Sequence, residues 1–387
     1  MLPPSSPLLA VLALTGLPFS NADSSTASDA CNQISSKISG ASDVIQALNP
    51  DFFPDIHHWY LSSSQMPECV LEPGSADDLA TAMKIIASTR SPFAVKSGGH
   101  ASIPGFSSTE GVHISLKRMN QVVLSEDKST VELGMGLVYG GVAIYGNDEI
   151  DAVLNATEQF DSQNVDPKAQ IITTISGSAT GTTSMVLFFY DGPERPESFA
   201  PFDNIASTIS HTKTQSFVDF VKGFPANYLP QARGTFHTLS TSKLTPGFLN
   251  AVRNETDTLG KIMAEHSGYS VGYDIEPFLK TWGDNATESA YPHANSPLPL
   301  NLDFAWLSSD DDEFWYDAMR SSVNRLKEVA QQEGIYSPSD FTTYPNYAIA
   351  DTKAEELYGT KNAARLRSIR SQVDPDGVME LAGGFTI

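Results

Sequence analysis

A short strand that runs straight into two glycines is the feature that most limits how this chain folds. Residues 92–100 read Pro-Phe-Ala-Val-Lys-Ser-Gly-Gly-His, so an apolar, buried strand ends in Ser97-Gly98-Gly99-His100. Consecutive glycines allow positive φ angles and leave backbone N–H groups uncovered. Such N–H groups can cradle a pyrophosphate, to which Ser97 adds a hydroxyl donor. By itself, however, the pattern is better explained as a tight turn with a surface histidine.

The segments around this turn predict an α+β unit. Ser75 is placed to cap a helix, with Asp78 three residues later as in a capping box. Short strands precede and follow this helix without the regular alternation of a Rossmann βαβ series. The expected elements are a short helix within 31–48, the capped helix, and strands at 67–71, 93–96, 111–116, 122–124 and 130–133.

A second α+β domain with a mainly antiparallel sheet is expected in the middle of the chain. Strands and helices alternate there, and the strand at 184–190 is almost wholly apolar. The amphipathic helix at 310–332 carries acidic residues at its N-terminus, as the helix dipole favours. The other expected elements are strands at 138–145, 169–176 and 270–275 and helices at 148–160, 216–221 and 247–266.

The charge of the chain limits its partners. The formal net charge of the 387 residues is −22. A surface of this sign is repelled by a phosphate backbone and by an anionic membrane face, which argues against nucleic acid and membrane partners. The acidic composition alone does not identify a substrate, because it also serves solubility.

The N-terminal residues predict export. Residues 8–17 form an apolar run that is too short to span a bilayer and is typical of a secretory signal, so we expect residues 1–22 to be removed. No other apolar stretch is long enough for a membrane span, and a secreted, soluble protein is expected. Cys31 and Cys69 then predict one disulfide, and no Cys/His cluster predicts a metal site. Sequons at Asn155, Asn254 and Asn285 predict glycosylation.

Two sets of residues carry a resemblance to a known family. Together they resemble FAD-linked oxidases with a PCMH-type, vanillyl-alcohol-oxidase-like FAD-binding domain, and within that group the secreted fungal relatives of berberine bridge enzyme. The resemblance covers most of the chain after the predicted signal. The first set is residues 67–73, 93–100, 105–108 and 111–116, and the second is Asn346-Tyr347, Tyr358-Gly359, Asp374-Pro375 and Gly383-Gly384-Phe385.

The resemblance implies a flavin site at the glycine turn. His100 matches the histidine that many relatives join to the 8α position of the flavin ring. The tail motif that contains Tyr344 and Tyr347 matches the segment beside that ring, and one of these tyrosines, with a lowered pKa, would take the proton of a substrate hydroxyl while hydride goes to flavin N5. The implied cofactor-binding residues are Lys96, Ser97, Gly98, Gly99, His100, Gly105 and Asn346.

One part of the family pattern is missing. In the family, the strand that resembles residues 130–136 leads into the second half of the FAD domain. Here the chain passes from Leu137 directly to Val138, which begins a segment like the first strand of the substrate domain. We therefore expect a truncated FAD-binding domain at 23–137, a substrate domain at 138–335, and a C-terminal segment at 336–387 that returns to the first domain. The incomplete pocket predicts weak or absent FAD binding.

Two hypotheses of function follow. The first is an FAD-dependent oxidoreductase that acts on an alcohol, a sugar or a secondary metabolite and passes electrons to O2. The alternative is a non-catalytic secreted remnant of the same fold, or the product of a mis-spliced gene. A hydrolase is disfavoured, because the sequence has no Gly-x-Ser-x-Gly elbow and its histidines show no triad order.

Overall fold

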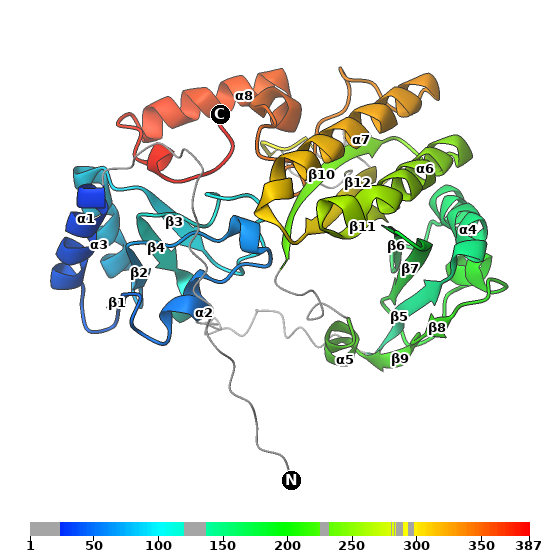
Figure 1. The fold of residues 1–387 in the computed structure, drawn as a ribbon, viewed down its shortest axis with the longest axis horizontal. Coiled ribbons are helices and arrows are strands. Elements are labelled where there is room, and N and C mark those ends of the chain that lie inside the picture. Colours follow the sequence, from blue (N-terminus) through cyan, green and yellow to red (C-terminus); the bar gives the residue numbers. More distant parts are fainter. Residues whose placement is uncertain are drawn as a thin grey trace, which may run out of the picture.

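Two separate β-sheets organise the chain (Figure 1). The structure is a computed structural model that describes residues 24–119, 137–224, 232–279, 281, 283, 289–292 and 298–387. Sheet A has four strands and is built from the first part of the chain, and sheet B has eight strands and is built from the middle. The expected α+β fold class, with a mainly antiparallel sheet in the middle of the chain, is confirmed.

Sheet A is mixed, with three parallel strands and one antiparallel edge strand. Its order is β1-β2-β4-β3, and β1 is the antiparallel strand. Helices α1 (Ser24–Lys37) and α3 (Ala76–Thr89) pack on one face, where a disulfide joins Cys31 of α1 to Cys69 of β2, as expected. Both cysteines are buried in that core. The strands are β1 (Asp43–Ile45), β2 (Cys69–Glu72), β3 (Phe93–Lys96) and β4 (Val112–Ser115).

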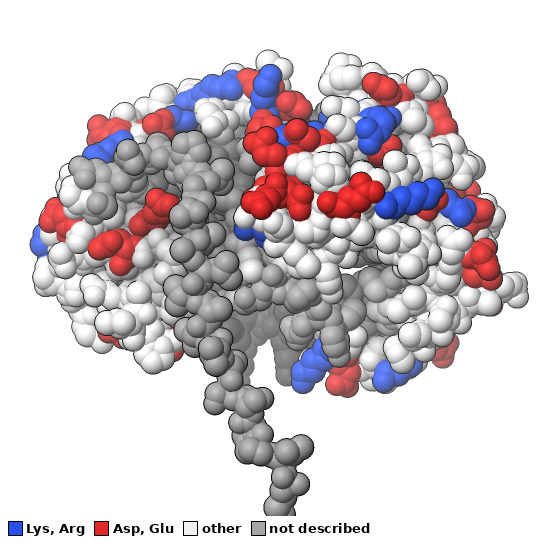
Figure 2. Space-filling model, viewed as in Figure 1, with Lys and Arg blue, Asp and Glu red and all other residues white. Residues whose placement is uncertain are grey.

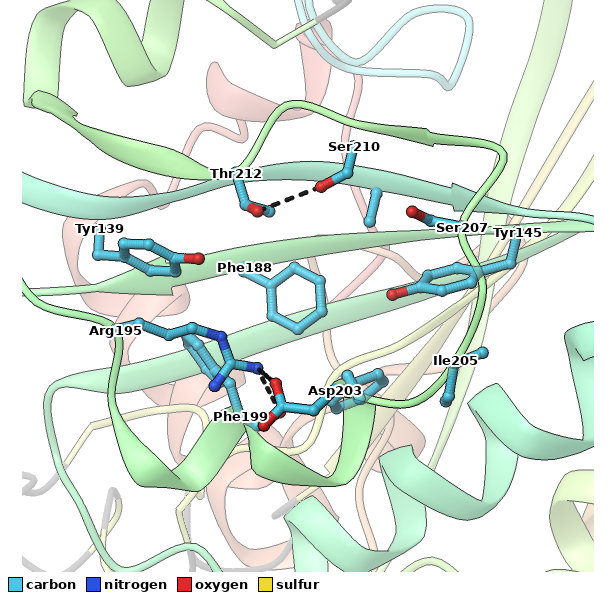
Figure 3. A pocket seen from close by; sticks show the side chains of 12 residues that line it. Tyr139, Tyr145, Phe188, Arg195, Phe199, Asp203, Ile205, Ser207, Ser210 and Thr212 are labelled. Atoms are coloured by element: carbon cyan, nitrogen blue, oxygen red, sulfur yellow. Dashed lines mark hydrogen bonds and ion pairs between the residues drawn. The ribbon is translucent and has the colours of Figure 1, made fainter.

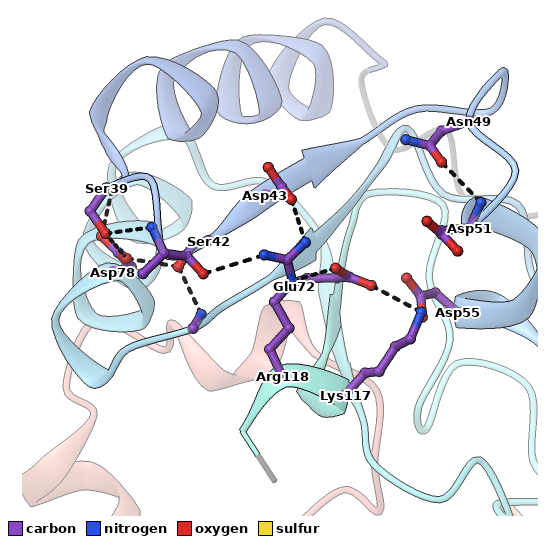
Figure 4. Close-up of polar contacts among 12 residues, drawn as sticks. Ser39, Ser42, Asp43, Asn49, Asp51, Asp55, Glu72, Asp78, Lys117 and Arg118 are labelled. Atoms are coloured by element: carbon purple, nitrogen blue, oxygen red, sulfur yellow. Dashed lines mark hydrogen bonds and ion pairs between the residues drawn. The ribbon is translucent and has the colours of Figure 1, made fainter. Parts of the chain in front are cut away.

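Helix α3 begins where the sequence predicts. The Ser75 hydroxyl accepts a hydrogen bond from the backbone N–H of Asp78 at 3.1 Å. The Asp78 carboxylate does not reach back to close a capping box. It accepts instead from the backbone N–H and the hydroxyl of Ser39 and from the hydroxyl of Ser42, as Figure 4 shows. These hydrogen bonds hold the pKa of Asp78 well below its usual value and tie the start of α3 to the segment before β1.

A second polar network joins β1, β2 and the short helix α2 (Phe52–Ile56) (Figure 4). Lys117 lies 3.4 Å from the Asp55 carboxylate and 3.3 Å from Glu72. Arg118 donates to Glu72 at 2.6 Å and also pairs with Asp43 on β1. Burial raises the pKa of the Asp55 carboxyl, since only 2% of Asp55 is exposed. The network compensates buried charge on the face of sheet A opposite α1 and α3.

Sheet B is antiparallel throughout its described pairings. Its order is β10-β12-β11-β6-β7-β5-β8, and β9 also pairs with β5. Helices α4 (Ile150–Gln163), α6 (Pro246–Ile262) and α7 (Asp312–Gln332) cover one face (Figure 1). The strands are β5 (Leu137–Tyr145), β6 (Ala169–Ser178), β7 (Gly181–Tyr190), β8 (Ile209–Ser210), β9 (Lys213–Ser216), β10 (Arg233–Thr241), β11 (Gly268–Ile275) and β12 (Leu298–Trp306).

The two faces of sheet B differ in chemistry. Successive strand residues point to opposite faces, so the apolar residues of β11 and β12 that pack under α6 and α7 leave their neighbours on the other side. Tyr273 and Ile275 lie in the helix-side core, and Asp274 and Glu276 therefore lie on the opposite face. We call this opposite face of β10, β12, β11 and β6 the open face. It carries polar residues, because burying them in the apolar core under the helices would cost free energy.

The C-terminal residues pack on sheet A. After α8 (Ala354–Val373) and the 3-10 turn η8 (Met379–Leu381), Ala382 forms a parallel bridge with Phe93 of β3. The Phe385 ring contacts Phe106 edge to face at 4.9 Å. Gly383 lies so close that a Cβ placed on it would come within 1.7 Å of the Gly105 carbonyl oxygen. The chain thus returns to the first sheet (Figure 1, red), while the domain boundaries near 137 and 335 stay predictions.

Some sequence-based predictions differ from the structure. The helix expected within 31–48 begins earlier and ends at Lys37, because Val44 and Ile45 pair with β2 as strand β1. Strands β10 and β12 and helices α5 (Phe217–Lys222) and α8 complete the fold, and of these only α5 was expected. The strands expected at 122–124 and 130–133, the signal at 1–22 and Asn285 lie outside the described residues.

The surface agrees with the acidic composition. Figure 2 shows acidic side chains over the viewed face, with one group near its middle. Asn155 on α4 and Asn254 on α6 are exposed, and their glycosylation stays a prediction. Within the described ranges, no helix combines the length and the apolar character that crossing a bilayer requires.

Candidate active site

The glycine turn after β3 leaves Gly98 exposed and Gly99 buried. Gly99 has φ 71°, and its carbonyl accepts from the backbone N–H of Trp59 at 3.0 Å. A Cβ on Gly98 would meet no atom within 4 Å. In the described part of the chain, the N–H groups of Gly98, Gly99 and His100 donate no hydrogen bond. The turn therefore has the free donors that an anion cradle needs.

The other residues predicted at the turn have different surroundings. Ser97 is exposed beside Gly98. The Lys96 side chain folds beneath the turn, since a Cβ on Gly99 would lie 2.7 Å from its Cε, and burial lowers the pKa of Lys96. Gly105, with φ 85°, packs against the C-terminal Gly383. Its described contacts are therefore those of a residue that packs two chain segments together.

His100 stands where the loops of sheet A meet sheet B. Its exposed ring stacks on Trp59, with centroids 5.1 Å apart and an interplanar angle of 20°. On the side of sheet B it lies nearly parallel to Phe236 of β10 at 6.4 Å. Phe236 in turn contacts the Tyr347 ring at 6.3 Å. His100 and Tyr347, about 250 residues apart in sequence, thus meet around one phenyl ring.

Three carboxylates lie on the open face beside this ring. Asp274 and Glu276 come from β11 and its end, and Asp303 comes from β12, where it pairs with Phe236. Burial raises the pKa of all three, and for Glu276 and Asp303 it reaches about 7. The charge of Asp274 raises the pKa of the other two further. Glu276 and Asp303 are therefore about half-protonated near neutral pH, which suits groups that exchange protons.

Each carboxylate has a specific donor. The Tyr347 hydroxyl donates to Glu276 Oε1 at 2.9 Å. Tyr60 donates to Asp303 Oδ1 through its hydroxyl. Asp274 accepts from Thr174 Oγ1 at 2.6 Å and from Asn301 Nδ2 at 3.0 Å. Within the described residues, no three His, Cys, Asp or Glu side chains are arranged to hold a metal ion.

Only part of the tail motif lies at the carboxylate row. Tyr347 reaches the carboxylate row, whereas Asn346 is exposed and donates to the Tyr344 hydroxyl at 2.8 Å. Burial and the nearby Glu276 raise the pKa of Tyr347 well above its usual value. The role of base that the sequence suggested for a tyrosine requires a lowered pKa, so at this position Glu276 has the better-matched chemistry.

Sequence reasoning missed most of the carboxylate row. Trp59, Tyr60, Asp274, Glu276 and Asp303 were not singled out. A signal was present at the end of β11, where Asp274 and Glu276 alternate with Tyr273 and Ile275, because a carboxylate next to buried apolar residues lies on the other face of a strand. Without the order of the strands, nothing in the sequence places that face next to the glycine turn.

Comparison with known proteins supports a flavin site. Residues 67–185 match the family described as an FAD binding domain. An FAD-dependent monooxygenase of Emericella nidulans is 26% identical over 270 residues, which cover 65% of this chain and 55% of that protein. One from Aspergillus calidoustus is 22% identical over 449 residues, covering 85% of this chain and 84% of that protein. The chain thus spans about half the length of the first of these relatives.

The fold agrees with these matches. Glucooligosaccharide oxidase from Acremonium strictum superposes with a TM-score of 0.66 at 13% identity, over 90% of this chain and 97% of that protein. At this identity the likeness shows the fold alone. The matched range of the FAD domain ends at Met185, within β7 of sheet B.

The residues present fit one side of an FAD molecule. The free N–H groups at Gly98 and Gly99 suit the pyrophosphate. The exposed imidazole of His100, stacked on Trp59 and facing Phe236, suits the edge of the flavin ring. Residues 67–185 thus match an FAD binding domain, and the fold of the chain is shared with the glucooligosaccharide oxidase.

Proposed function

We propose that this chain is an FAD-dependent oxidoreductase that oxidises a hydroxyl-bearing carbon of a small molecule, such as an alcohol, a sugar or a secondary metabolite. The observation that carries the proposal is the Tyr347–Glu276 hydrogen bond of 2.9 Å, which lies beside the stack of Phe236 and His100. When bound, FAD supplies the two-electron acceptor for the hydride of the substrate carbon and passes the electrons to O2.

In this proposal the chain's own residues handle the proton. Glu276, with a pKa of about 7, accepts the hydroxyl proton of the substrate as the carbonyl forms, so the proton and the hydride together balance the two-electron oxidation. Tyr347 holds the Glu276 carboxylate in place through its hydroxyl. The three carboxylates on the open face also attract a proton donor or a partly positive substrate group.

His100 is proposed as the covalent attachment point of the flavin. Its ring is exposed, and stacking on Trp59 fixes its plane. The glucooligosaccharide oxidase of the same fold is described with an 8α-N1-histidyl FAD that is also joined to a cysteine. The chain offers no second attachment of that kind, because its only two cysteines form the disulfide.

The alternative function is a secreted protein of this fold without a working flavin site. The alignment with the Aspergillus calidoustus relative spans 449 residues, which exceeds the 387 residues of this chain. That relative therefore contains residues with no counterpart here, which supports the proposal that the second half of the FAD domain is missing near Leu137. Sequencing the transcript across the codons of Leu137 and Val138 tests whether an exon has been skipped.

An absorbance measurement separates the two functions. The purified protein is incubated with FAD, precipitated with acid and washed, and the pellet is scanned for the visible flavin band. Flavin in the pellet supports covalent attachment, and the His100→Ala variant is then expected to release it into the supernatant. A protein that stays colourless after incubation with FAD overturns the oxidoreductase proposal. The alternative, a protein of this fold without a working flavin site, then remains.

The location of the protein belongs to the same proposal. The apolar run at 8–17, the sequons at Asn155 and Asn254 and the disulfide support a secreted glycoprotein. Mass spectrometry of the protein from the culture medium tests this. The expected result is a mature N-terminus near residue 23 and hexose-rich masses on peptides that contain Asn155 or Asn254.

A further inference from the structure

We propose that a second small-molecule site lies on the helix side of sheet B and binds one neutral sugar ring or a polyol of similar size. The site is a pocket of about 190 Å³ between the edge of sheet B at β5 and the 3-10 turn η4 (Glu197–Phe202) (Figure 3). This volume holds about six water molecules at liquid density, which suits one sugar ring. Nothing in the proposed oxidation uses this pocket.

Two tyrosine hydroxyls point into the pocket. Tyr139 and Tyr145 lie on the same face of β5, and Figure 3 shows their hydroxyls directed from opposite sides toward the Phe188 ring. Only 3% of Tyr145 is exposed. Neither hydroxyl has a hydrogen-bond partner among the residues that the structure describes. A hydroxyl this buried is stabilised when a ligand or water bonds to it.

Further hydroxyls close the pocket on the side of β8. Ser210 and Thr212 lie 3.2 Å apart through their side-chain oxygens, and Ser207 is exposed beside them. A ring of hydroxyl groups, each of which can donate and accept, matches a ligand whose own hydroxyls do the same. A ligand with a single polar group would leave most of them unpaired.

The charges of the pocket cancel each other. Arg195 pairs with Asp203 at 2.5 Å and also donates to the Phe199 carbonyl at 2.8 Å. Burial raises the pKa of Tyr145, so that its phenol stays neutral near pH 7. With one cation and one anion held together, the pocket has no net charge to attract an anion or a cation. The geometry favours a neutral polar ligand.

An aromatic floor completes the chemistry. Phe188 packs edge to face against Phe199 at 5.1 Å and against Phe202 at 5.1 Å. A sugar ring combines an apolar C–H face with hydroxyls at its edge, so it can cover the Phe188 ring while its edge meets the tyrosines and the Arg195–Asp203 pair. The open face with the carboxylate row lies on the other side of the sheet, so the two sites are separate.

Ligand-observed saturation-transfer NMR on the full chain tests the proposal with glucose, N-acetylglucosamine and inositol as probes. The expected result is binding of at least one probe that the Tyr139→Phe/Tyr145→Phe variant weakens about 25-fold, since each lost hydrogen bond costs about a factor of five. The conservative Thr212→Val variant, which removes one hydroxyl, is expected to weaken binding about fivefold. Circular dichroism confirms that each variant is folded.

A matched control separates this site from the proposed active site. The Tyr347→Phe variant removes a hydroxyl on the open face and is expected to bind the probes as the wild type does. The proposal is overturned if no neutral probe binds, or if the double variant binds them unchanged. It is also overturned if gluconate or glucose 6-phosphate binds more tightly than glucose, because a neutral pocket gives no preference for an anion.

Discussion

At Gly99 the backbone takes a φ of 71°, in the left-handed region that residues with a Cβ rarely adopt. A Cβ there would also come within 2.7 Å of Lys96 Cε and 3.0 Å of the His57 carbonyl. The neighbouring Gly98 has neither constraint, because no atom lies within 4 Å of its would-be Cβ. The two glycines of the turn therefore serve different purposes, one conformational and one that keeps the approach to the backbone open.

The two alanine variants are expected to separate these purposes. Gly99→Ala should lower the free energy of unfolding by about 1–2 kcal/mol, the cost of the left-handed conformation for a residue with a Cβ. Gly98→Ala should stay within about 0.5 kcal/mol of the wild type and act only on FAD binding. Urea denaturation without added flavin measures both. Equal losses for the two variants would contradict this assignment.

At the scale of the element, the start of α3 shows what a sequence can specify. The Ser75 cap is local, and its hydrogen bond to the Asp78 N–H forms as the pattern indicates. The Asp78 carboxylate is engaged by Ser39 and Ser42, which are more than 30 residues away, and no local pattern indicates that.

The cap provides a prediction for this element. Ser75→Ala removes the acceptor of one otherwise unpaired helix N–H and is expected to destabilise the protein by about 1 kcal/mol. Ser88→Ala, in the exposed part of the last turn of α3, is the matched control and should change stability by less than about 0.5 kcal/mol. Chemical denaturation followed by circular dichroism measures both variants. A Ser75→Ala protein as stable as the control would show that the cap contributes nothing.

Strands β10 and β12 were not predicted from the sequence, and each omission has a physical reason. Strand β10 carries Thr, Ser and His at buried positions, so it lacks the apolar alternation that marks a strand. Strand β12 contains Pro299, which argues against a central strand. In the structure Pro299 lies beyond the last pairing between β11 and β12, Ile275–Leu300, so β12 keeps that ladder intact. Helix α8 is interrupted at Gly359, whose φ is 72°.

At the scale of the whole molecule, the candidate site depends on contacts between distant segments. The glycine turn could be predicted from residues 92–100 alone. Its meeting with Phe236, Glu276 and Tyr347 could not, because it requires the order of strands in sheet B and the path of the tail. A sequence pattern of period two shows which face of a β-sheet a residue occupies. It does not show which other segment of the chain packs against that face.

The disulfide gives a first prediction for the whole molecule. It joins α1 to β2 across 38 residues of sequence. The loop-closure model gives it about 4 kcal/mol of stability for a loop of this length. The Cys31→Ala/Cys69→Ala variant is therefore expected to unfold at clearly lower urea concentration. Wild-type protein treated with a reductant should shift by a similar amount, and an unchanged midpoint in both would contradict the model.

The carboxylate row predicts how stability depends on pH. The folded-state pKa of Glu276 is about 7, above the 4.5 of the free side chain, so the folded protein holds this proton more tightly than the unfolded chain does. The stabilisation is complete below about pH 4.5 and is lost as the pH rises through about 7. Glu276→Gln removes the charged form and keeps an acceptor for Tyr347. At about pH 8 the variant should be more stable than the wild type, by up to about 3 kcal/mol.

The same variant separates stability from function. Without a titratable group at this position the proton of the substrate has no acceptor, so Glu276→Gln is expected to lose turnover while it gains stability at alkaline pH. Near pH 4 the wild type already holds the proton, and the two proteins should then be equally stable. The control is Glu313→Gln, which removes a carboxylate from the exposed side of α7, away from the carboxylate row. Thermal melts across this pH range measure all three proteins. If Glu276→Gln were less stable than the wild type at high pH, Glu276 would be charged and well paired in the folded protein. The assignment of Glu276 as the base would then lose its physical basis.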